Sequence, residues 1–445
     1  MKIGLISYGS AVNRYDIAQE YLNQTCQWLK NDTGYDIISI QKIVMDDEAN
    51  QAAIAYLKQE GIQLLIIQLG TFAQGNMMID LVMGLGEIPL FVWGFNDPIV
   101  ESHPTIPLNS LTGMMMMTSY LYKLGRKYSF GYGDFGDKTV CSQVLDMARA
   151  VDVKEQLRRS RYAIVGSRVP GFYGCMVDEL RFRKELGPEI VYYSLASMLH
   201  AAKKQDPRKV EARMNELAEN YSVAVNPDML EKNIRIEFAL KEYAERECIN
   251  ALTLKCWPEL QELYHCAGCA ALSELNEYGI TAGCEGDIQG LTAMDILRKM
   301  SKKAVFFADL VGMTKSGGLK AWHCGFGPRS LADDPRKVRY IEQATMRNGL
   351  GTGIQYDMRE GVVTLCGFSE QKDSYKLLVA VGQSEKTDRK ALGVQTDIRW
   401  KHSTKELIYT AAEQGFGQHY ALVHEDLRRP LREFAKWTGM ECVEL

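Results

Sequence analysis

The chain reads TAGCEGDIQGLTAMDILRKM over residues 281–300, KAVFFADLVG over 303–312 and LKAWHCGFGP over 319–328. Glu285 precedes a predicted helix, Asp309 ends an apolar run short enough for a buried strand, and His323 ends a second short run. Any one of these residues alone could simply cap a helix or pack in the core. Three of them at consecutive element ends favour a metal site. Oxygen and imidazole ligands together suit Mn, Fe, Co or Zn better than Ca.

The helix predicted after Glu285 is amphipathic and begins with acidic residues. Its apolar stripe recurs every three residues and consists of Ile288, Leu291, Met294 and Leu297. Glu285 and Asp287 stand at its N-terminus, where the helix dipole stabilises a carboxylate as an anion. A bend between a strand and a helix is also where an open α/β sheet places its ligands. We therefore expect Glu285 to face a ligand, and Asp287 to point away and serve mainly the helix dipole.

Length and composition limit the class of protein. A chain of 445 residues is too long for one typical core and suggests two or three domains. The formal net charge of -4 gives no basic face for nucleic acid, and no apolar run approaches the roughly 18 residues that span a bilayer. Eleven cysteines stand mostly singly, as is typical of reduced thiols in the cytoplasm. We expect a cytoplasmic protein without a nucleic-acid or membrane partner.

Three patterns of elements follow one another along the chain. Strands and helices alternate within a first domain, residues 1–160, and again within a second, residues 161–302, which predicts parallel sheets covered by helices. Short β-rich segments separated by polar turns fill residues 303–445 and predict an antiparallel barrel or sandwich. The usual dinucleotide and P-loop motifs are absent. A glycine-rich bend precedes His419, which makes it the best candidate for a ligand from the third domain, with His424 as the alternative.

Five short motifs occur in order through the second half of the chain. They are CWPE from Cys256, CEGD from Cys284, FxxD from Phe306, WHCxxxP from Trp322, and a late histidine, His419, before a terminal helix. In this set the sequence resembles the superfamily of L-fucose isomerase and L-arabinose isomerase, which are aldose–ketose isomerases. WGFN over residues 93–96 is also similar to the N-terminal domain of fucose isomerases. The resemblance covers essentially the whole chain, and it is specific to the superfamily but not to one sugar.

The resemblance implies a fold, a metal and a set of ligands. The implied fold has two Rossmann-like or flavodoxin-like parallel-sheet domains followed by a C-terminal antiparallel β-barrel-like domain. The implied assembly is a homo-oligomer, often a trimer or hexamer. By position in the motifs, Glu285 and Asp309 match the two carboxylates of a Mn²⁺ site, and His419 matches the C-terminal histidine ligand. His323 matches a histidine that binds metal in the arabinose branch and is less clearly a ligand in the fucose branch.

These residues suit the isomerisation of an aldose, which moves one proton between C1 and C2 and another between O1 and O2. A divalent metal that holds both oxygens would stabilise the enediolate, with Glu285 and Asp309 as general base and acid. The predicted substrate-binding residues are Arg14, Trp93, Trp257 and Gln418. Arg14 and Trp93 are expected in strand-end loops of the first domain, which by resemblance reach the cleft of a neighbouring subunit.

Two other functions stay open at this point. A metal-free sugar-binding module would also use α/β lobes and aromatic platforms, but it would not need Glu, Asp and His at successive element ends. A metal-dependent epimerase or hydrolase could use the same ligands. The chain is shorter than the fucose and arabinose isomerases, so its sugar stays open and includes deoxy or anionic sugars, for example a sulfonated one.

Overall fold

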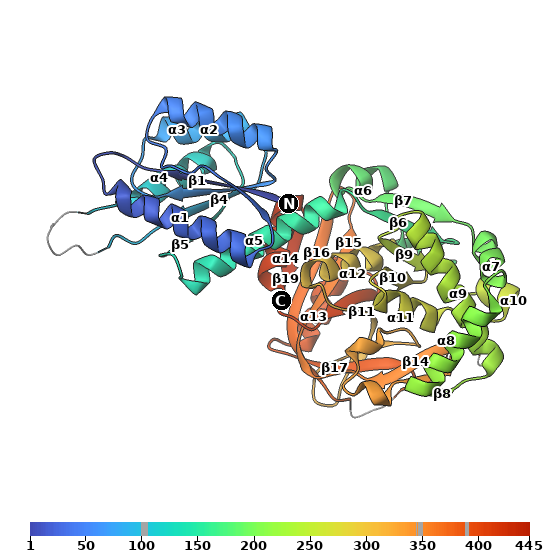
Figure 1. The fold of residues 1–445 in the computed structure, drawn as a ribbon. Helices are drawn as coiled ribbons and strands as arrows, with labels where there is room; N and C mark the ends of the chain where they lie inside the picture. The colour runs from blue at the N-terminus through green and yellow to red at the C-terminus, as the bar shows by residue number, and fades with distance from the viewer. Residues whose placement is uncertain (99–105, 344, 346–349, 388–390) are drawn as a thin grey trace. The chain divides into compact units, whose positions relative to one another are not determined.

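The computed structural model describes residues 1–98, 106–343, 345, 350–387 and 391–445. The chain forms two compact units, residues 1–155 and 156–445, and helix α5 (Lys138–Leu157) spans the boundary between them (Figure 1). None of the helices in the described ranges combines the length and apolar character that crossing a membrane would need. All eleven cysteines are free thiols.

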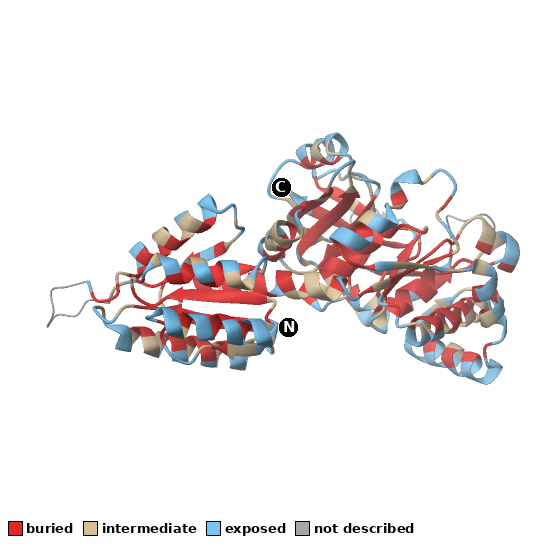
Figure 2. Ribbon diagram, turned by 90° about the horizontal axis from the view of Figure 1, so that it is seen from above, coloured by how far each residue is buried: buried red, intermediate tan, exposed pale blue. Residues whose placement is uncertain are grey.

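The first unit contains a parallel sheet whose strands, within the described residues, have the order β2-β1-β3-β4-β5. This is the flavodoxin-like order, one of the two folds expected. The strands are β1 (Lys2–Tyr8), β2 (Asp36–Ser39), β3 (Leu64–Leu69), β4 (Leu90–Gly94) and β5 (Ser129–Tyr132), and the helices are α1 (Tyr15–Asp32), α2 (Asp47–Glu60), α3 (Gly75–Leu85), α4 (Ser110–Lys123) and α5. Strands β3 and β4 are buried along their whole length because helices cover both faces of the sheet (Figure 2).

The second unit contains another parallel sheet, whose described strands have the order β10-β9-β6-β7. Its strands are β6 (Arg161–Val165), β7 (Glu189–Tyr193), β9 (Ala251–Leu254) and β10 (Thr281–Cys284), and its helices are α6 (Glu179–Glu185), α7 (Leu195–Lys203), α8 (Pro207–Asn220), α9 (Pro227–Arg246), α10 (Glu259–Tyr264), α11 (Cys269–Glu277) and α12 (Ile288–Ser301). After β6 the chain continues to β7 on one side of the sheet, and after β9 it continues to β10 on the other side. The loops after β6 and β9 therefore flank the crevice where open α/β sheets bind ligands.

The last part of the chain, together with the short strand β8, builds a mixed sheet, ten-stranded within the described residues, in the order β19-β16-β15-β18-β11-β12-β17-β14-β13-β8. Its elements are β8 (Ser222–Ala224), β11 (Phe306–Met313), β12 (Leu319–His323), β13 (Arg339–Glu342), β14 (Thr352–Asp357), β15 (Gly361–Glu370), β16 (Tyr375–Glu385), β17 (Val394–Trp400), β18 (His419–Val423) and β19 (Glu441–Glu444), with helices α13 (Thr404–Glu413) and α14 (Arg428–Thr438). Strand β16 also pairs with β17, so six antiparallel strands form a closed ring. The predicted antiparallel character holds for this ring, while β19, β14 and β8 add parallel pairings.

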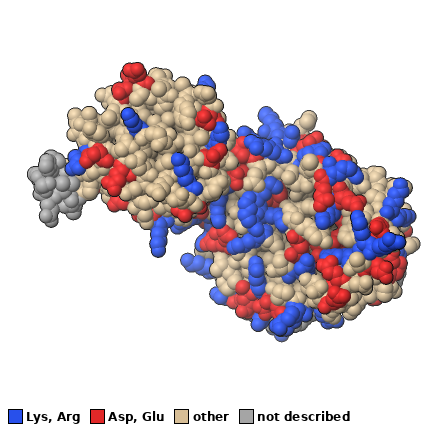
Figure 3. Space-filling model, in the orientation of Figure 1, with Lys and Arg blue, Asp and Glu red and all other residues tan. Residues whose placement is uncertain are grey.

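A buried charge network ties the helices of the second parallel sheet to the mixed sheet. The carboxylate of Glu274 in α11 is almost fully buried and lies 2.7 Å from Nη2 of Arg213 in α8. It also accepts hydrogen bonds from the hydroxyl of Tyr340, at 2.6 Å, and from Nε of Arg329, at 3.2 Å. Removing one partner of such a buried pair costs about 3–5 kcal/mol, so this network fixes the two sheets relative to each other. At the surface, basic and acidic side chains are interspersed over the face of this unit that Figure 3 shows.

Candidate active site

Glu285 occupies a tight turn between β10 and α12. Its φ of 65° lies in the left-handed region, which is uncommon for a residue other than glycine and carries strain. Gly286 follows with a φ of 71°, and a Cβ atom there would lie 2.3 Å from the carbonyl oxygen of Ser167. The turn thus requires glycine at position 286 and presents the Glu285 carboxylate at the carboxyl end of the sheet.

Asp309 and His419 meet because strands β11 and β18 are paired. The antiparallel register places Asp309 directly opposite His419, and opposite residues have Cβ atoms about 4.5–5.5 Å apart. Nε2 of His419 lies 3.0 Å from Oε2 of Glu285 and 3.5 Å from Oδ1 of Asp309. Two of the four predicted metal ligands, Glu285 and Asp309, therefore each lie close to a third, His419. Two carboxylates and an imidazole form a donor set that fits Mn²⁺ or Zn²⁺.

The strand that carries Asp309 is longer than the apolar run predicts. Strand β11 does not end at Asp309 but continues to Met313, because its second half pairs with β12. Asp309 is instead the last β11 residue paired with β18, which begins at His419. The carboxylate thus lies where a neighbouring strand begins, and its side chain is 32% exposed.

His323 lies at the end of β12, buried in an aromatic cluster. Its ring centroid is 5.7 Å from that of Phe307, whose ring is also 4.5 Å from the ring of His419. Nδ1 of His323 lies 3.7 Å from Sγ of Cys324. Within the described residues, no hydrogen bond links His323 to a carboxylate. The role of His323 as a metal ligand stays a prediction.

Asp287 does not point away from the site, so that prediction is wrong. Its Oδ1 accepts a hydrogen bond from the backbone N–H of Gly290 at 3.0 Å and caps α12, as the sequence predicts. Its Oδ2 lies 2.7 Å from Nδ1 of His419. The cap uses only one carboxylate oxygen, which leaves the other for the histidine. A histidine that donates from Nδ1 to a carboxylate keeps Nε2 available for a metal.

Replacing Asp287 by Asn is therefore expected to lower metal affinity or activity by about 10- to 100-fold, the usual effect of losing the partner of a ligating histidine. The amide oxygen of Asn can still cap the helix, so the melting temperature should change little. Bound metal and kcat are the measurements. Asp206→Asn is the matched control, because Asp206 caps α8 in the same unit without touching the site. Normal metal content and rate in Asp287→Asn would contradict the positioning role.

The protein groups of the site shift one another's pKa values. Burial by itself lowers the pKa of His419, but hydrogen bonds to Asp287, Cys175 and Glu285 outweigh it and raise the pKa well above its usual value. Burial raises the pKa of Glu285, but the hydrogen bond with His419, the charges of His419 and His323 and the hydrogen bond from Trp257 together outweigh burial and leave this pKa below its usual value. Burial raises the pKa of Asp309 above its usual value. The pKa of Glu285 is thus lowered while that of Asp309 is raised, so the two carboxyl groups differ in acidity.

A second group of possible ligands includes Asp287, which lies at Nδ1 of the His419 ring. Cys175, at the end of a short 3-10 helix (Tyr173–Cys175), Asp287 and His419 have ligand atoms within 4.8 Å of one another, and all three are buried. Asp287 already accepts from Nδ1, and burial raises the pKa of the Cys175 thiol. The partly exposed carboxylates at Nε2 are therefore the better place for a metal that would contact a substrate from solvent. No sequence motif points to Cys175.

Two of the predicted substrate-binding residues adjoin this site. Nε1 of Trp257 donates a hydrogen bond to Oε1 of Glu285 at 3.2 Å. Gln418 is exposed, precedes His419, and donates from Nε2 to Sγ of Cys175 at 3.8 Å. Their roles as sugar contacts stay predictions.

The other two predicted substrate-binding residues lie in the first unit. Trp93 is not in a loop but inside β4, fully buried, so that placement is wrong. Its Nε1 donates to the carbonyl oxygen of Gly133 at 2.9 Å, and its ring stacks on Phe95 with centroids 5.4 Å apart. The role of Trp93 in substrate binding stays a prediction, as does that of Arg14. Arg14 does lie in the loop before α1, where it is exposed and pairs with Asp16 at 2.6 Å.

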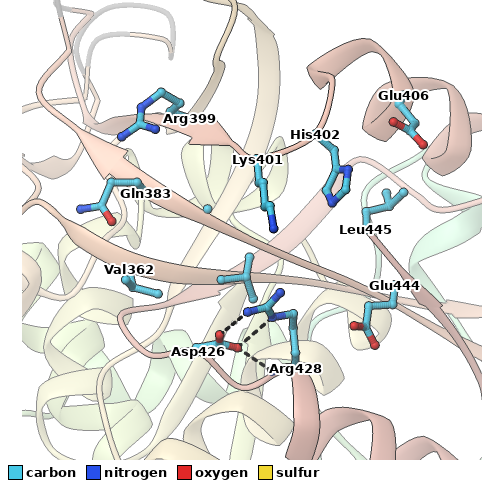
Figure 4. Close-up of a pocket in the computed structure, with 12 residues that line it drawn as sticks. Val362, Gln383, Arg399, Lys401, His402, Glu406, Asp426, Arg428, Glu444 and Leu445 are labelled. Atoms are coloured by element: carbon cyan, nitrogen blue, oxygen red, sulfur yellow. Dashed lines mark hydrogen bonds and ion pairs between the residues drawn. The ribbon is translucent and has the colours of Figure 1, made fainter.

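A separate pocket of about 610 Å³ lies beside β15, β16 and β17 (Figure 4). It is lined by basic and acidic side chains in equal number, namely Arg399, Lys401 and Arg428 against Glu406, Asp426 and Glu444. Figure 4 shows Arg428 held against Asp426, at 2.6 Å. None of the predicted site residues lines this pocket. Because the basic and acidic side chains balance, the charge of the pocket does not indicate a class of ligand.

Comparisons with known proteins bear on the family of the chain. Residues 177–303 match the family described as the L-arabinose isomerase central domain. The chain is 28% identical to a sulfoquinovose isomerase of Alkalicoccus urumqiensis over 86% of each chain, and 25% identical to one of Priestia aryabhattai over 96% of this chain and 95% of the relative. A sugar-binding protein of an ABC transporter from Agrobacterium vitis aligns at 12% identity over 68% of this chain and 90% of its own, with a TM-score of 0.16, too low to bear on the fold. The matched family and these relatives place the chain in the L-arabinose/L-fucose isomerase-like superfamily.

Proposed function

We propose that this protein isomerises a sulfonated aldose to the corresponding ketose. The observation that carries the proposal is the convergence of Glu285 and Asp309 on Nε2 of His419 at the carboxyl end of a parallel sheet. The similarity to sulfoquinovose isomerases supports the sulfonated substrate, since sulfoquinovose is an aldose with a sulfonate on C6. A metal-free sugar-binding module would not need these three groups together, and the relatives support neither an epimerase nor a hydrolase.

Glu285 and Asp309 are the groups that we assign to the transfer of the carbon-bound proton between C2 and C1. A carboxylate takes the proton from C2 of the aldose, and this proton is then delivered to C1. The hydroxyl proton passes from O2 to O1, so atoms and charge balance. Carboxyl groups that differ in pKa are typical of acid–base pairs. Here burial keeps the pKa of Asp309 high, whereas His419 holds that of Glu285 low despite its burial. Trp257 fixes the other oxygen of Glu285.

The proposed metal is Mn²⁺, held by Glu285, Asp309 and His419, with His323 as a further candidate ligand. When bound, a divalent metal supplies polarisation of the carbonyl and charge balance for the enediolate. The mixed oxygen and nitrogen donors support this choice over Mg²⁺ or Ca²⁺. Asp287 orients the imidazole from the opposite side of the ring.

The substrate is tested with the wild-type enzyme, Mn²⁺ and a panel of aldoses with product analysis. We expect sulfoquinovose to be converted to its ketose with a higher kcat/KM than 6-deoxyglucose, L-fucose or L-arabinose. The sulfonate is the feature that separates sulfoquinovose from 6-deoxyglucose, so this pair isolates its effect. Equal rates on these two sugars, or a product that is not a ketose, would contradict the proposal.

We also propose that residues 303–445 form the barrel-like domain expected for the superfamily, and that the chain assembles as a trimer or hexamer in the cytoplasm. The closed ring of six antiparallel strands supports the first point. The superfamily resemblance supports the assembly. The free cysteines are consistent with a reducing compartment.

A further inference from the structure

Three loops gather at the carboxyl end of the second parallel sheet. Residues 166–172 follow β6, residues 255–258 follow β9, and Glu285 lies after β10. The first two flank the crevice between β6 and β9, where strand connections diverge and open α/β sheets bind ligands. A sugar held at Glu285 therefore has these loops as its neighbours.

Arg168 belongs to the first of these loops and is packed against the Glu285 turn. The backbone N–H of Val169 donates to the carbonyl oxygen of Glu285 at 3.4 Å. A Cβ atom on Gly286 would lie 2.7 Å from Cα of Arg168. Because the two backbones touch, the long side chain of Arg168 starts beside the residue that is assigned to proton transfer.

The guanidinium group of Arg168 is charged and contacts a backbone carbonyl and an aromatic ring. Its Nη1 donates to the carbonyl oxygen of Val169 at 3.2 Å, and its Cζ lies 4.5 Å from the ring centroid of Tyr173, which is 77% exposed. Among the residues that the structure describes, no carboxylate pairs with Arg168. Lys255 in the second loop differs, because it is buried and its ammonium group pairs with Glu259. Most of the five donors of Arg168 thus stay available for an anion.

We infer that Arg168 binds the oxyanion of the substrate and thereby selects a sulfonated aldose over a neutral one. This inference rests on the proposed isomerase function. A guanidinium group suits the task because its planar fork donates two parallel hydrogen bonds to an oxyanion and stays charged at all working pH values. Stacking on Tyr173 limits the orientations of that fork. Arg168 is a specificity residue that leaves the proton transfer itself to Glu285 and Asp309.

The test compares kcat/KM for sulfoquinovose and 6-deoxyglucose in the wild type, Arg168→Gln and Arg168→Lys. Loss of a charge-assisted pair should lower kcat/KM for sulfoquinovose by about 10- to 100-fold, mainly through KM, and leave 6-deoxyglucose unchanged. The kcat/KM of Arg168→Lys for sulfoquinovose should fall between those of the wild type and Arg168→Gln, because lysine keeps the charge but lacks the planar guanidinium group. Arg183→Gln is the matched control, since Arg183 also donates Nη1 to a backbone carbonyl, that of Gly187, before β7.

The outcomes separate this inference from the proposed function. A wild type that isomerises sulfoquinovose together with an Arg168→Gln variant of equal KM overturns the role of Arg168 alone. An equal loss on both sugars also overturns it. A wild type that is inactive on sulfoquinovose overturns both. Glucose 6-phosphate tests which oxyanion is bound. If the wild type has a higher kcat/KM for glucose 6-phosphate than for sulfoquinovose, and Arg168→Gln abolishes that difference, Arg168 is supported as the anion site. The same result overturns a sulfonate as the anion that it binds.

Discussion

Replacing Glu285 by Gln or Asp309 by Asn is expected to lower kcat by about 10²- to 10⁴-fold, the range that general acid–base catalysis covers. Each change keeps the size of the side chain and removes the anion. Both residues lie within 3.5 Å of Nε2 of His419, so each change also removes a candidate metal ligand. Bound metal should therefore fall together with the rate. The measurements are kcat on sulfoquinovose and metal content by elemental analysis.

Asp334→Asn is the control for these variants, because Asp334 is a surface carboxylate of the same unit that pairs with Arg336. It should keep full rate and full metal content. Thermal melts exclude unfolding as the cause of a lost rate. A Glu285→Gln or Asp309→Asn variant that holds metal and turns over at the wild-type rate would remove that residue from the mechanism.

Local patterns account for what the sequence predicts correctly. The apolar stripe that begins at Ile288 predicts a helix, and α12 covers Ile288–Ser301 with that face buried. Asp287 is predicted at the helix start and does cap it. Alternating strands and helices predict the parallel sheets, which the structure confirms. These features depend on residues a few positions apart, and the local sequence determines them.

Contacts between distant segments are what the sequence alone does not determine. The meeting of Asp309 and His419 depends on the register between β11 and β18, and motif order gives no register. The second oxygen of Asp287 reaches His419 only because β18 packs on the start of α12. Trp93 is read as a loop residue from its motif, but it lies within β4, fully buried, with the ring of Trp28 in α1 6.4 Å away. Arg168 belongs to no motif, and only the fold places it beside the Glu285 turn.

Removing divalent metal is expected to abolish the isomerisation, and Mn²⁺ should restore it better than Mg²⁺. Mg²⁺ prefers oxygen ligands in a strict octahedron, whereas an imidazole ligand favours Mn²⁺ or a later transition metal. The protein is treated with a chelator, checked for unchanged fold by circular dichroism, and assayed with each metal. Full activity in protein that elemental analysis finds free of metal would contradict the enediolate mechanism.

The most direct measurement is the position of Mn²⁺ by anomalous X-ray scattering from crystals of the metal-loaded protein. We predict one peak at bonding distance from Glu285, Asp309 and Nε2 of His419. In that position Asp287 keeps its hydrogen bond to Nδ1 on the opposite side of the ring. A peak on the Nδ1 side, bound by Cys175 and Asp287, or no peak at either side in a fully active protein, would contradict the central claim.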